Sequence, residues 1–384
     1  MTKGQLEDRF LLQFNYAAKV VAAAPGRINL IGEHTDYNEG LVMPASIDCV
    51  AMVALRQNKL NQYRLIANDL DERVEVAVDK LVKNEKQWAN YLLGVVDQLR
   101  KRGHEISGFD CSLTCDVPTG AGLSSSAAIE CAIVKGLDEL FNLGLEKWEM
   151  VRIGQASENE FVGANTGMLD QFASIFGEAD TALLLDCRSL EVRKQSVNLP
   201  GHQFVVLNTG VKHNHMVSGY ADRRADCERA VELLKENGWE GTSLRDLNET
   251  DLKNTALSQD ENASKRATFI FHENQRVADA AEQLDKGDVA GFGESLTAGH
   301  WGLSKDYEVS CVESDFIVQF SENHAASKGA RQMGGGFGGC VLCVVQTDSV
   351  TTFIAEAQGA YFNQFAITLE PLTIKIGRGA SIIS

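Results

Sequence analysis

Proline and long apolar stretches are scarce in this chain. Only five prolines occur among 384 residues, and no proline-rich linker, repeat or low-complexity tract is present. No run approaches the ~18 apolar residues of a membrane-spanning helix. Charged residues between Met1 and Phe10 occupy the positions where a secretory signal peptide carries its apolar core. We therefore expect a cytoplasmic protein that does not associate with a membrane.

Positive charge is also in deficit. The chain has 36 Lys and Arg residues against 53 Asp and Glu residues, a net charge of -17. General binding to nucleic acid or to an anionic membrane requires a basic face, so the charge argues against both partners. It does not exclude an anionic substrate, because a few arginines and glycines at one site can override the global sign. The sequence leaves the oligomeric state open; a monomer is the favoured expectation.

The cysteines lack the pairing that a disulfide framework or a zinc site requires. Nine are spread from Cys49 to Cys343, an odd number that fits reduced thiols in a cytoplasm. Cys340 and Cys343 have CxxC spacing, but no second pair or histidine lies nearby in the sequence, which favours a core strand. Cys111 and Cys115 lie in an alternating segment and are predicted to pack.

The length of 384 residues exceeds the usual size of one hydrophobic core, so we expect two domains. Hydrophobic periodicity indicates that they are of α/β or α+β type. We expect strands at 19–24, 42–55, 63–67, 74–78, 109–115, 180–187, 203–208, 339–346 and 368–376. We expect helices at 88–99, 221–236, 263–284, 311–324 and 350–362, and one that begins around residue 127. The break at Pro200-Gly201 places the boundary between domains 1–200 and 201–384.

The segment 117–130 combines glycines and hydroxyls at the start of a predicted helix. Gly120 and Gly122 allow the backbone to approach a ligand, and three consecutive serines follow. A helix start exposes free N–H groups and a positive dipole end, which suit a polyphosphate and its Mg²⁺. The segment is neither a Walker loop nor GxGxxG. On the residues alone, an ordinary capped helix after a turn is an equally good interpretation.

A second polar cluster, Glu33-His34-Thr35-Asp36, directly follows Gly32. A solvated turn is one interpretation of such a cluster. A metal site is another, although the His-Glu-x-x-His spacing of zinc enzymes is absent. Carboxylates and an imidazole at one turn also suit hydrogen bonding to neighbouring hydroxyls of a sugar.

Three segments together resemble the GHMP small-molecule kinases. The segment Pro118-x-Gly120-x-Gly122-Leu123-Ser124-Ser125-Ser126-Ala127 resembles their phosphate loop. The segments Pro25–Asn38 and Gly334–Gly339 resemble the galactokinase branch of that family. The resemblance covers nearly the whole chain. It implies a two-domain α+β GHMP kinase fold, with an N-terminal domain like domain 2 of ribosomal protein S5 and a ferredoxin-like C-terminal domain. The active site would lie in the cleft between them.

The resemblance implies ATP-dependent phosphorylation of galactose at O1, with Mg²⁺. Asp170, in Gly167-Met-Leu-Asp170-Gln171, would be the catalytic base, and Arg27 would lie beside the transferred phosphoryl group. Residues expected to bind galactose are Glu33, His34, Asp36, Gly167 and Tyr220. Residues expected to bind ATP are Trp88, Pro118, Gly120, Gly122, Leu123, Ser124, Ser125, Ser126 and Ala127. The expected Mg²⁺ ligands are Glu158 and either Ser125 or Ser126, with Glu130 as a rival carboxylate.

One departure from the family and two alternative functions remain. Met333 stands where galactokinases commonly have threonine before the C-terminal glycines, so one hydroxyl is missing. A related anomeric sugar kinase would act on N-acetylgalactosamine, galacturonate or arabinose. A non-catalytic galactose and ATP sensor is the alternative from another class. The known sensor of this family lacks a Ser-Ala pair in the phosphate loop, whereas Ser126-Ala127 is present here.

Overall fold

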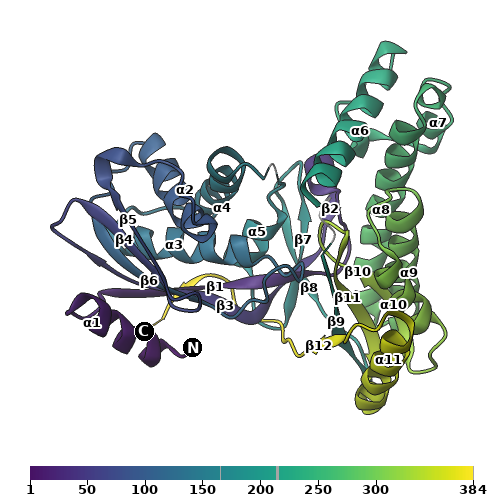
Figure 1. Cartoon of the computed structure of the whole chain (residues 1–384). Coiled ribbons are helices and arrows are strands. Elements are labelled where there is room, and N and C mark those ends of the chain that lie inside the picture. The colour runs from purple at the N-terminus through teal and green to yellow at the C-terminus, as the bar shows by residue number, and fades with distance from the viewer. Residues whose placement is uncertain (165, 213–215, 384) are drawn as a thin grey trace.

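The computed structural model describes residues 1–164, 166–212 and 216–383, and its larger sheet occupies the N-terminal part of the molecule (Figure 1). The strand order is β13-β1-β3-β6-β4-β5, and of these pairs β4 and β6 are parallel whereas the others are antiparallel. The strands are β1 Val20–Asn29, β3 Pro44–Gln57, β4 Gln62–Ala67, β5 Glu72–Ala77, β6 Phe109–Cys115 and β13 Ser381–Ile382.

Helices cover both faces of this sheet because its central strands alternate apolar residues toward each side. Ala22 and Val53 belong to the main core beneath helix α3, whereas Val21 and Met52 pack against helix α1 on the opposite face. Figure 1 shows α1 on one side of the sheet and α2 to α5 on the other. These helices are α1 Lys3–Phe14, α2 Gln87–Lys101, α3 Ser125–Phe141, α4 Lys147–Ala156 and α5 Leu169–Phe176. A π-helical turn, Ser157–Val162, follows α4.

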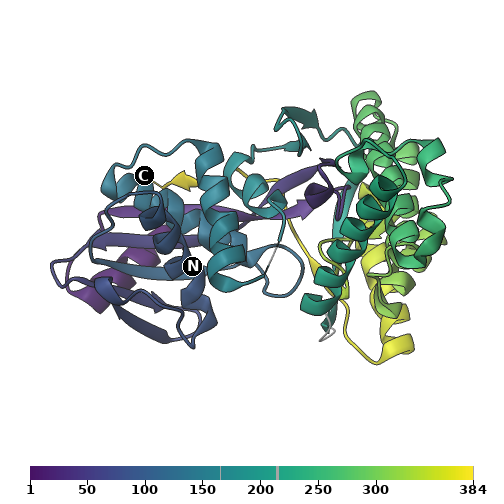
Figure 2. The same ribbon diagram turned by 90° about the horizontal axis from the view of Figure 1, so that it is seen from above.

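A second sheet, in the order β10-β11-β9-β12, lies among the C-terminal helices. Its strands are β9 His202–Lys212, β10 Ser327–Gln332, β11 Gly338–Gln346 and β12 Glu370–Leu372. The helices of this region are α6 Met216–Glu236, α7 Glu249–Leu252, α8 Glu261–Lys286, α9 Val289–Lys305, α10 Val312–Glu322 and α11 Val350–Phe365. In the view from above, these green and yellow-green helices gather at one end of the molecule (Figure 2).

A small sheet of β2 (Leu41–Val42), β7 (Thr181–Asp186) and β8 (Val192–Ser196) lies between the two larger sheets (Figure 1). The division after residue 200, which stays a proposal, falls in the segment between β8 and β9. The chain returns to the first sheet at its end, where β13 pairs with β1. Helices and sheets are therefore mixed as the α+β expectation requires.

Most predicted elements are present, but the expected strand at 368–376 is wrong in length. Only Glu370–Leu372 pairs with β9. The residues that follow leave this sheet for the first one, where Lys375 N donates to Asp48 Oδ1 at 2.9 Å and Ile376 forms a bridge with Ile47. The predicted strand 42–55 is likewise divided into β2 and β3.

The prediction that Cys340 and Cys343 lie in a core strand, and that Cys111 and Cys115 pack in a strand, is confirmed. Cys340 and Cys343 are fully buried in β11, Cys111 is buried in β6, and Cys115 is half-buried. None of the nine cysteines forms a disulfide. Among the described residues, the helices lack either the length or the apolar character that a membrane crossing requires.

Candidate active site

Two cavities share a wall that is formed by residues from distant parts of the chain. The carboxylate cavity, lined by Glu33, Asp36 and Asp170 among others, has a volume of about 220 Å³. The glycine cavity, lined by the glycines of 120–122 and 334–339, has a volume of about 330 Å³. Residues that line both cavities are Arg27, Asp170, Gly334 and Gly335. Any group transferred between ligands in these cavities has to pass this shared wall.

An ion pair between Arg27 and Asp170 stands in the shared wall. Arg27 comes from β1, and its Nε donates to Asp170 Oδ1 at 2.9 Å, while Nη2 lies 2.8 Å from the same oxygen. Asp170 is in the first turn of α5 and keeps 30% of its side chain exposed. Arg27 is only 5% exposed, and a further nitrogen donates to Gly122 O. The geometry therefore fixes one carboxylate at the meeting point of two cavities.

The loop 118–127, which resembles the phosphate loop of the GHMP kinases, places the uncapped start of helix α3 at the glycine cavity. Ser124 adopts left-handed backbone geometry with φ of 60° and makes no side-chain cap. Its hydroxyl instead donates to Asp170 Oδ2. The first N–H groups of α3 are thus not capped by Ser124, and they carry the positive end of the helix dipole. This arrangement suits an anion at the start of α3.

The two glycine segments face each other across the glycine cavity. Gly334 has φ of 76°, and a Cβ at this position would lie 3.5 Å from Gly122 O. A Cβ on Gly122 would lie 3.3 Å from Met333 O, so side chains here would crowd the facing backbone. Met333 is itself 1% exposed, and its N–H donates to Cys340 O at 2.9 Å. Glycine is favoured at both positions chiefly because Gly122 and Gly334 have φ of 74° and 76°, which other residues rarely adopt.

A group of oxygen and amide side chains lies beside the start of α3. Ser126 Oγ donates to Glu158 Oε1 at 3.0 Å, and Thr166 Oγ1 donates to Glu158 Oε2 at 3.0 Å. Gln171 Nε2 bridges to Glu158 at 2.9 Å and to Glu130 at 3.1 Å. Burial and the charge of Asp170 raise the pKa of Glu158 above its usual range.

These groups fit Mg²⁺ in chemical terms, because a hydroxyl and a buried carboxylate are hard oxygen donors. Glu130 Oε1 is buried and has no hydrogen-bond partner among the described residues. The described part of the chain contains no cluster of three His, Cys, Asp or Glu side chains that would hold a metal alone. Phosphate oxygens would have to complete the coordination.

The floor of the carboxylate cavity contains a buried network of charges. Glu33 Oε1 accepts from Gly334 N at 3.0 Å, and its other oxygen pairs with Arg331. Arg331, which is fully buried, also lies 3.8 Å from Glu273 and donates to Leu30 O at 3.0 Å. Burial raises the pKa of Glu33, although Arg331 opposes the shift. The network ties the Glu33 segment to the C-terminal glycine loop.

Asp36 lies against the backbone of Gly167 in the same cavity. A Cβ at Gly167 would lie 1.6 Å from Asp36 Oδ2, so only glycine permits this approach. Burial raises the pKa of Asp36 to about 6; the backbone N–H of Tyr37 opposes the shift, and the charge of Asp170 adds to it. Asp36 is therefore a partly desolvated acceptor within reach of a cavity ligand.

His34 and Tyr220 complete the wall of the carboxylate cavity. Their ring centroids are 5.3 Å apart, and a Cβ at Gly335 would lie 3.5 Å from the Tyr220 ring. Burial lowers the pKa of His34 to about 3, and the positive charge of Arg223 acts in the same direction. The imidazole is therefore neutral at ordinary pH.

The predicted nucleotide residues divide between the glycine cavity and its surroundings. Gly120, Gly122 and all three serines line the cavity. Leu123 and Ala127 are fully buried, and Leu123 contributes its carbonyl oxygen to Arg27 N at 3.0 Å. Two further residues expected to bind ATP, Pro118 and Trp88, also do not line the glycine cavity.

Trp88 is half-buried, and its indole N–H donates to Glu72. Tyr91, one turn further along α2, lines the glycine cavity instead. The expected role of Trp88 in binding ATP stays a prediction.

Sequence reasoning missed several residues of the site. Asn29 lines the carboxylate cavity and is 1% exposed, with both amide atoms unpartnered among the described residues. Its spacing of two from Arg27 on β1 was the available signal, because such residues share a face of a strand. Thr166, Arg331 and Glu273 carried no comparable signal, since only the tertiary fold brings them to Glu33 and Glu158.

Known proteins resemble this chain in sequence and in fold. A family model described as the GHMP kinases N terminal domain matches residues 90–178, which include the helix-start loop and Asp170. The M. jannaschii mevalonate kinase structure has a TM-score of 0.66 at 17% identity, and covers 93% of this chain and 98% of that one, so it supports the fold alone. The protein is a GHMP kinase in fold, as expected.

More specific matches narrow the family. A model described as the galactokinase galactose-binding signature matches residues 8–57. The galactokinase of Roseiflexus sp. (strain RS-1) is 38% identical over 358 residues, which are 93% of this chain and 91% of that protein. The galactokinase of Ligilactobacillus salivarius (strain UCC118) is 36% identical over the whole of both chains. The crystal structure of Lactococcus lactis galactokinase complexed with galactose has a TM-score of 0.94 at 35% identity, covering 98% and 99% of the two chains. The chain belongs to the galactokinase family.

Proposed function

We propose that the protein transfers the γ-phosphoryl group of ATP to O1 of α-D-galactose, giving galactose 1-phosphate and ADP. The observation that carries this proposal is the Arg27–Asp170 pair in the wall shared by the two cavities. Galactose occupies the carboxylate cavity and the phosphates of ATP occupy the glycine cavity. The anomeric hydroxyl then meets the γ-phosphate beside Asp170.

Asp170 accepts the proton of the anomeric hydroxyl as O1 attacks phosphorus and the bond to the β-phosphate oxygen breaks. Arg27 holds the carboxylate in place through two nitrogens on Oδ1, and its fixed charge stabilises the negative charge of the moving phosphoryl group. Ser124, which bonds Oδ2, is the second support of that carboxylate. Phosphoryl transfer through a loose transition state depends chiefly on such positioning and electrostatics.

Ser126 and Glu158 would hold Mg²⁺, which neutralises phosphate charge when bound. The 3.0 Å contact between Ser126 Oγ and Glu158 favours Ser126 over Ser125 as the hydroxyl ligand. The first N–H groups of α3 bind phosphate oxygens, and the glycines around 120 and 334 let the backbone approach them. Thr166 and Gln171 orient Glu158 from its other oxygen.

The carboxylate cavity recognises the sugar by hydrogen bonds to its hydroxyls. Asp36 and Glu33 accept hydrogen bonds from them, and Gly167 gives Asp36 room to do so. Tyr220 packs beside His34, whose Nε2 is buried and finds no partner among the described residues. The free thiols of all nine cysteines support the further proposal that the enzyme works in a cytoplasm.

A panel assay tests the reaction. ADP release is followed with ATP, Mg²⁺ and each of galactose, glucose, N-acetylgalactosamine, galacturonate and arabinose, and the product is identified by NMR. We expect turnover to be fastest with galactose and the phosphate to be on O1. Binding of galactose and ATP without turnover would instead indicate a sensor, and a faster rate with another sugar would indicate a related anomeric kinase.

A further inference from the structure

The side of His34 that faces away from the carboxylate cavity leads into a buried polar chain. His34 Nδ1 lies 2.9 Å from the hydroxyl of Tyr37, and that hydroxyl lies 2.8 Å from the hydroxyl of Tyr307. The Tyr307 hydroxyl lies 3.1 Å from Cys227 Sγ. This series of hydrogen bonds therefore connects His34, in the N-terminal part of the molecule, with Cys227 in helix α6.

Because the imidazole of His34 is neutral, it matters which partner donates in each of these hydrogen bonds. His34 carries one ring proton, on either Nδ1 or Nε2, and the partner of Nδ1 decides which nitrogen holds it. Nε2 has no hydrogen-bond partner among the described residues, although the backbone of Gly335, in the wall of the carboxylate cavity, acts on the imidazole and raises its pKa. A protonated Nε2 would donate a hydrogen bond to the oxygen of a sugar hydroxyl, whereas an unprotonated Nε2 would accept one from its hydrogen.

The contacts of Cys227, at the far end of these hydrogen bonds, favour one direction. The amide nitrogen of Asn38, which can only donate, lies 3.6 Å from Cys227 Sγ, so the sulfur already accepts one hydrogen bond. The thiol proton is then free for the Tyr307 oxygen. Burial raises the pKa of both tyrosines well above the usual range, so each keeps a proton to donate onward. With the thiol as the donor to Tyr307, the remaining directions follow: Tyr307 donates to Tyr37, and Tyr37 donates to His34 Nδ1.

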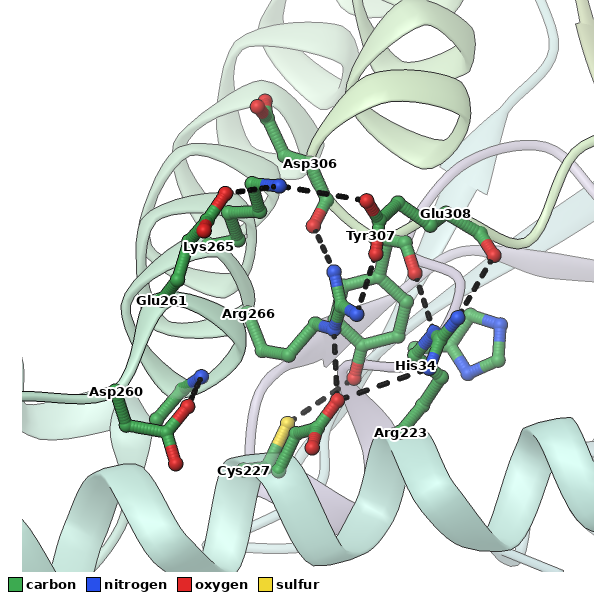
Figure 3. Close-up of polar contacts among 12 residues, drawn as sticks. His34, Arg223, Cys227, Asp260, Glu261, Lys265, Arg266, Asp306, Tyr307 and Glu308 are labelled. Atoms are coloured by element: carbon green, nitrogen blue, oxygen red, sulfur yellow. Dashed lines mark hydrogen bonds and ion pairs between the residues drawn. The ribbon is translucent and has the colours of Figure 1, made fainter.

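A clamp of charged side chains holds Tyr307 in place, as Figure 3 shows. Arg266, from α8, is fully buried and donates to Asp226 of α6 at 3.1 Å and to Glu308 at 2.7 Å. Arg223 Nε donates to the carbonyl oxygen of Tyr307 at 2.6 Å. The Tyr307 ring is itself packed 4.7 Å from the His34 ring. Such support leaves the hydroxyl of Tyr307 little freedom to find another partner.

The segment 306–309, which contains Tyr307, is hydrogen-bonded to the C-terminal glycine loop. Phe337 N donates to Val309 O at 2.7 Å, and a Cβ at Gly336 would lie 2.2 Å from that oxygen. Residues 306–309 thus support His34 on one side and the glycine cavity on the other.

We propose that Cys227, Tyr307 and Tyr37 form a hydrogen-bond relay that fixes His34 as the tautomer protonated on Nε2. Nε2 then donates a hydrogen bond to a sugar hydroxyl oxygen, and that hydroxyl in turn donates a hydrogen bond to a carboxylate of the cavity. Glu33, Asp36 and Asp170 can only accept when ionised, so a fixed donor complements them. Tyr307 and Tyr37 are positioning residues that act through His34. The role in sugar recognition rests on the proposed function; the tautomer itself does not.

The first test is Tyr307→Phe, which keeps the ring and removes the hydroxyl. With Tyr37 left without its outer partner, KM for galactose should rise roughly 5- to 50-fold, the effect of a lost buried hydrogen bond. Because the relay does not touch Asp170 or Arg27, kcat should change little. Tyr361→Phe is the matched control, since Tyr361 is fully buried and its hydroxyl donates to Thr209 O at 2.9 Å outside both cavities. A KM in Tyr307→Phe no higher than in the control would overturn the recognition role.

The second test measures the tautomer directly by ¹⁵N NMR of histidine-labelled full-length protein without sugar. The His34 signals are assigned by their loss in His34→Asn. We expect a protonated Nε2 in the wild type and a mixture of tautomers in Tyr37→Phe. A wild type protonated on Nδ1, or an unchanged tautomer in Tyr37→Phe, would refute the relay. If the wild type failed to phosphorylate galactose, the proposed function would fail while this measurement still judged the relay.

Discussion

At the scale of single residues, Asp170 has two structural partners, Arg27 and Ser124, and stands where two cavities meet. Neither partner is near it in sequence. The carboxylate is held in one orientation while part of it remains exposed to the cavities. This is the arrangement that a base for one incoming hydroxyl requires, because geometry decides proton transfer before pKa does.

Substitution of this pair is the first prediction. Asp170→Asn should leave galactose binding largely intact and lower kcat by about 10²–10⁴, the usual contribution of a positioned base. Arg27→Met should also lower kcat, and the double variant should lose less than the product of the single losses, because both residues act on one proton transfer. Steady-state kinetics with a direct galactose-binding assay measure both effects. Near-normal turnover of Asp170→Asn would remove this residue from the mechanism.

The pH dependence of sugar use is a second prediction at this scale. The pKa of Asp36 is raised to about 6, so the carboxyl is protonated below that pH and ionised above it. Protonation removes acceptor capacity toward a sugar hydroxyl, and kcat/KM for galactose should therefore fall as pH drops through about 6. The kcat/KM profile reports the free enzyme. In Asp36→Asn the overall value should be lower and this acidic step should be absent; its persistence would assign the step to another group.

At the scale of elements, the strands and the phosphate loop follow from local patterns, whereas some helices do not. Period-2 alternation correctly predicts β6, and the serines before an apolar run predict the start of α3. Helix α9 was missed because its sequence contains four glycines, which have low helix propensity. The structure supplies the reason for one of them: a Cβ at Gly293 would lie 2.0 Å from Lys328 O in β10. Local propensity cannot reveal a contact made with a strand formed later in the chain.

Gly293→Ala tests that packing. The added methyl group meets backbone rather than a flexible side chain, so the free energy of unfolding should fall by about 1–3 kcal/mol or more. Gly359→Ala is the matched control, because Gly359 lies in α11 and a Cβ added there would meet nothing within 4 Å. Alanine at this control position should raise stability by up to about 1 kcal/mol. Denaturant unfolding of both variants measures the difference. Equal stabilities would show that α9 does not pack as closely as its glycines indicate.

The start of α3 supports a further prediction. Deleting Ser126 and Ala127 removes the hydroxyl that contacts Glu158 and rotates the first N–H groups of the helix away from the glycine cavity. Turnover should vanish, whereas galactose binding in the other cavity should remain. Circular dichroism controls for folding, and calorimetry measures galactose binding. Strong kinase activity in the folded deletion variant would place the phosphate site elsewhere.

At the scale of the whole molecule, the site is assembled from distant segments of the chain, among them the loop before α3 that lines the glycine cavity. β1 supplies Arg27, the turn before α5 supplies Gly167, and the glycine loop before β11 closes both cavities. Motifs in the sequence identified each segment, and the roles that the family resemblance implies for their residues stay predictions. The buried partners Arg331, Glu273 and Tyr307 could not be found in this way, because nothing in their local sequence distinguishes them from structural residues.

If the two cavities phosphorylate galactose and bond its hydroxyls through buried groups, the protein has to discriminate between galactose and its epimers. The most direct measurement is kcat/KM for galactose and for glucose with the same wild-type preparation at saturating ATP and Mg²⁺. A site built to bond a hydroxyl rejects an analogue that presents it wrongly by about 10⁴ or more, because its buried polar groups are left unpaired. We therefore predict that glucose is a very poor substrate. Comparable values of kcat/KM for the two sugars would contradict the proposed reading of the carboxylate cavity as a galactose site.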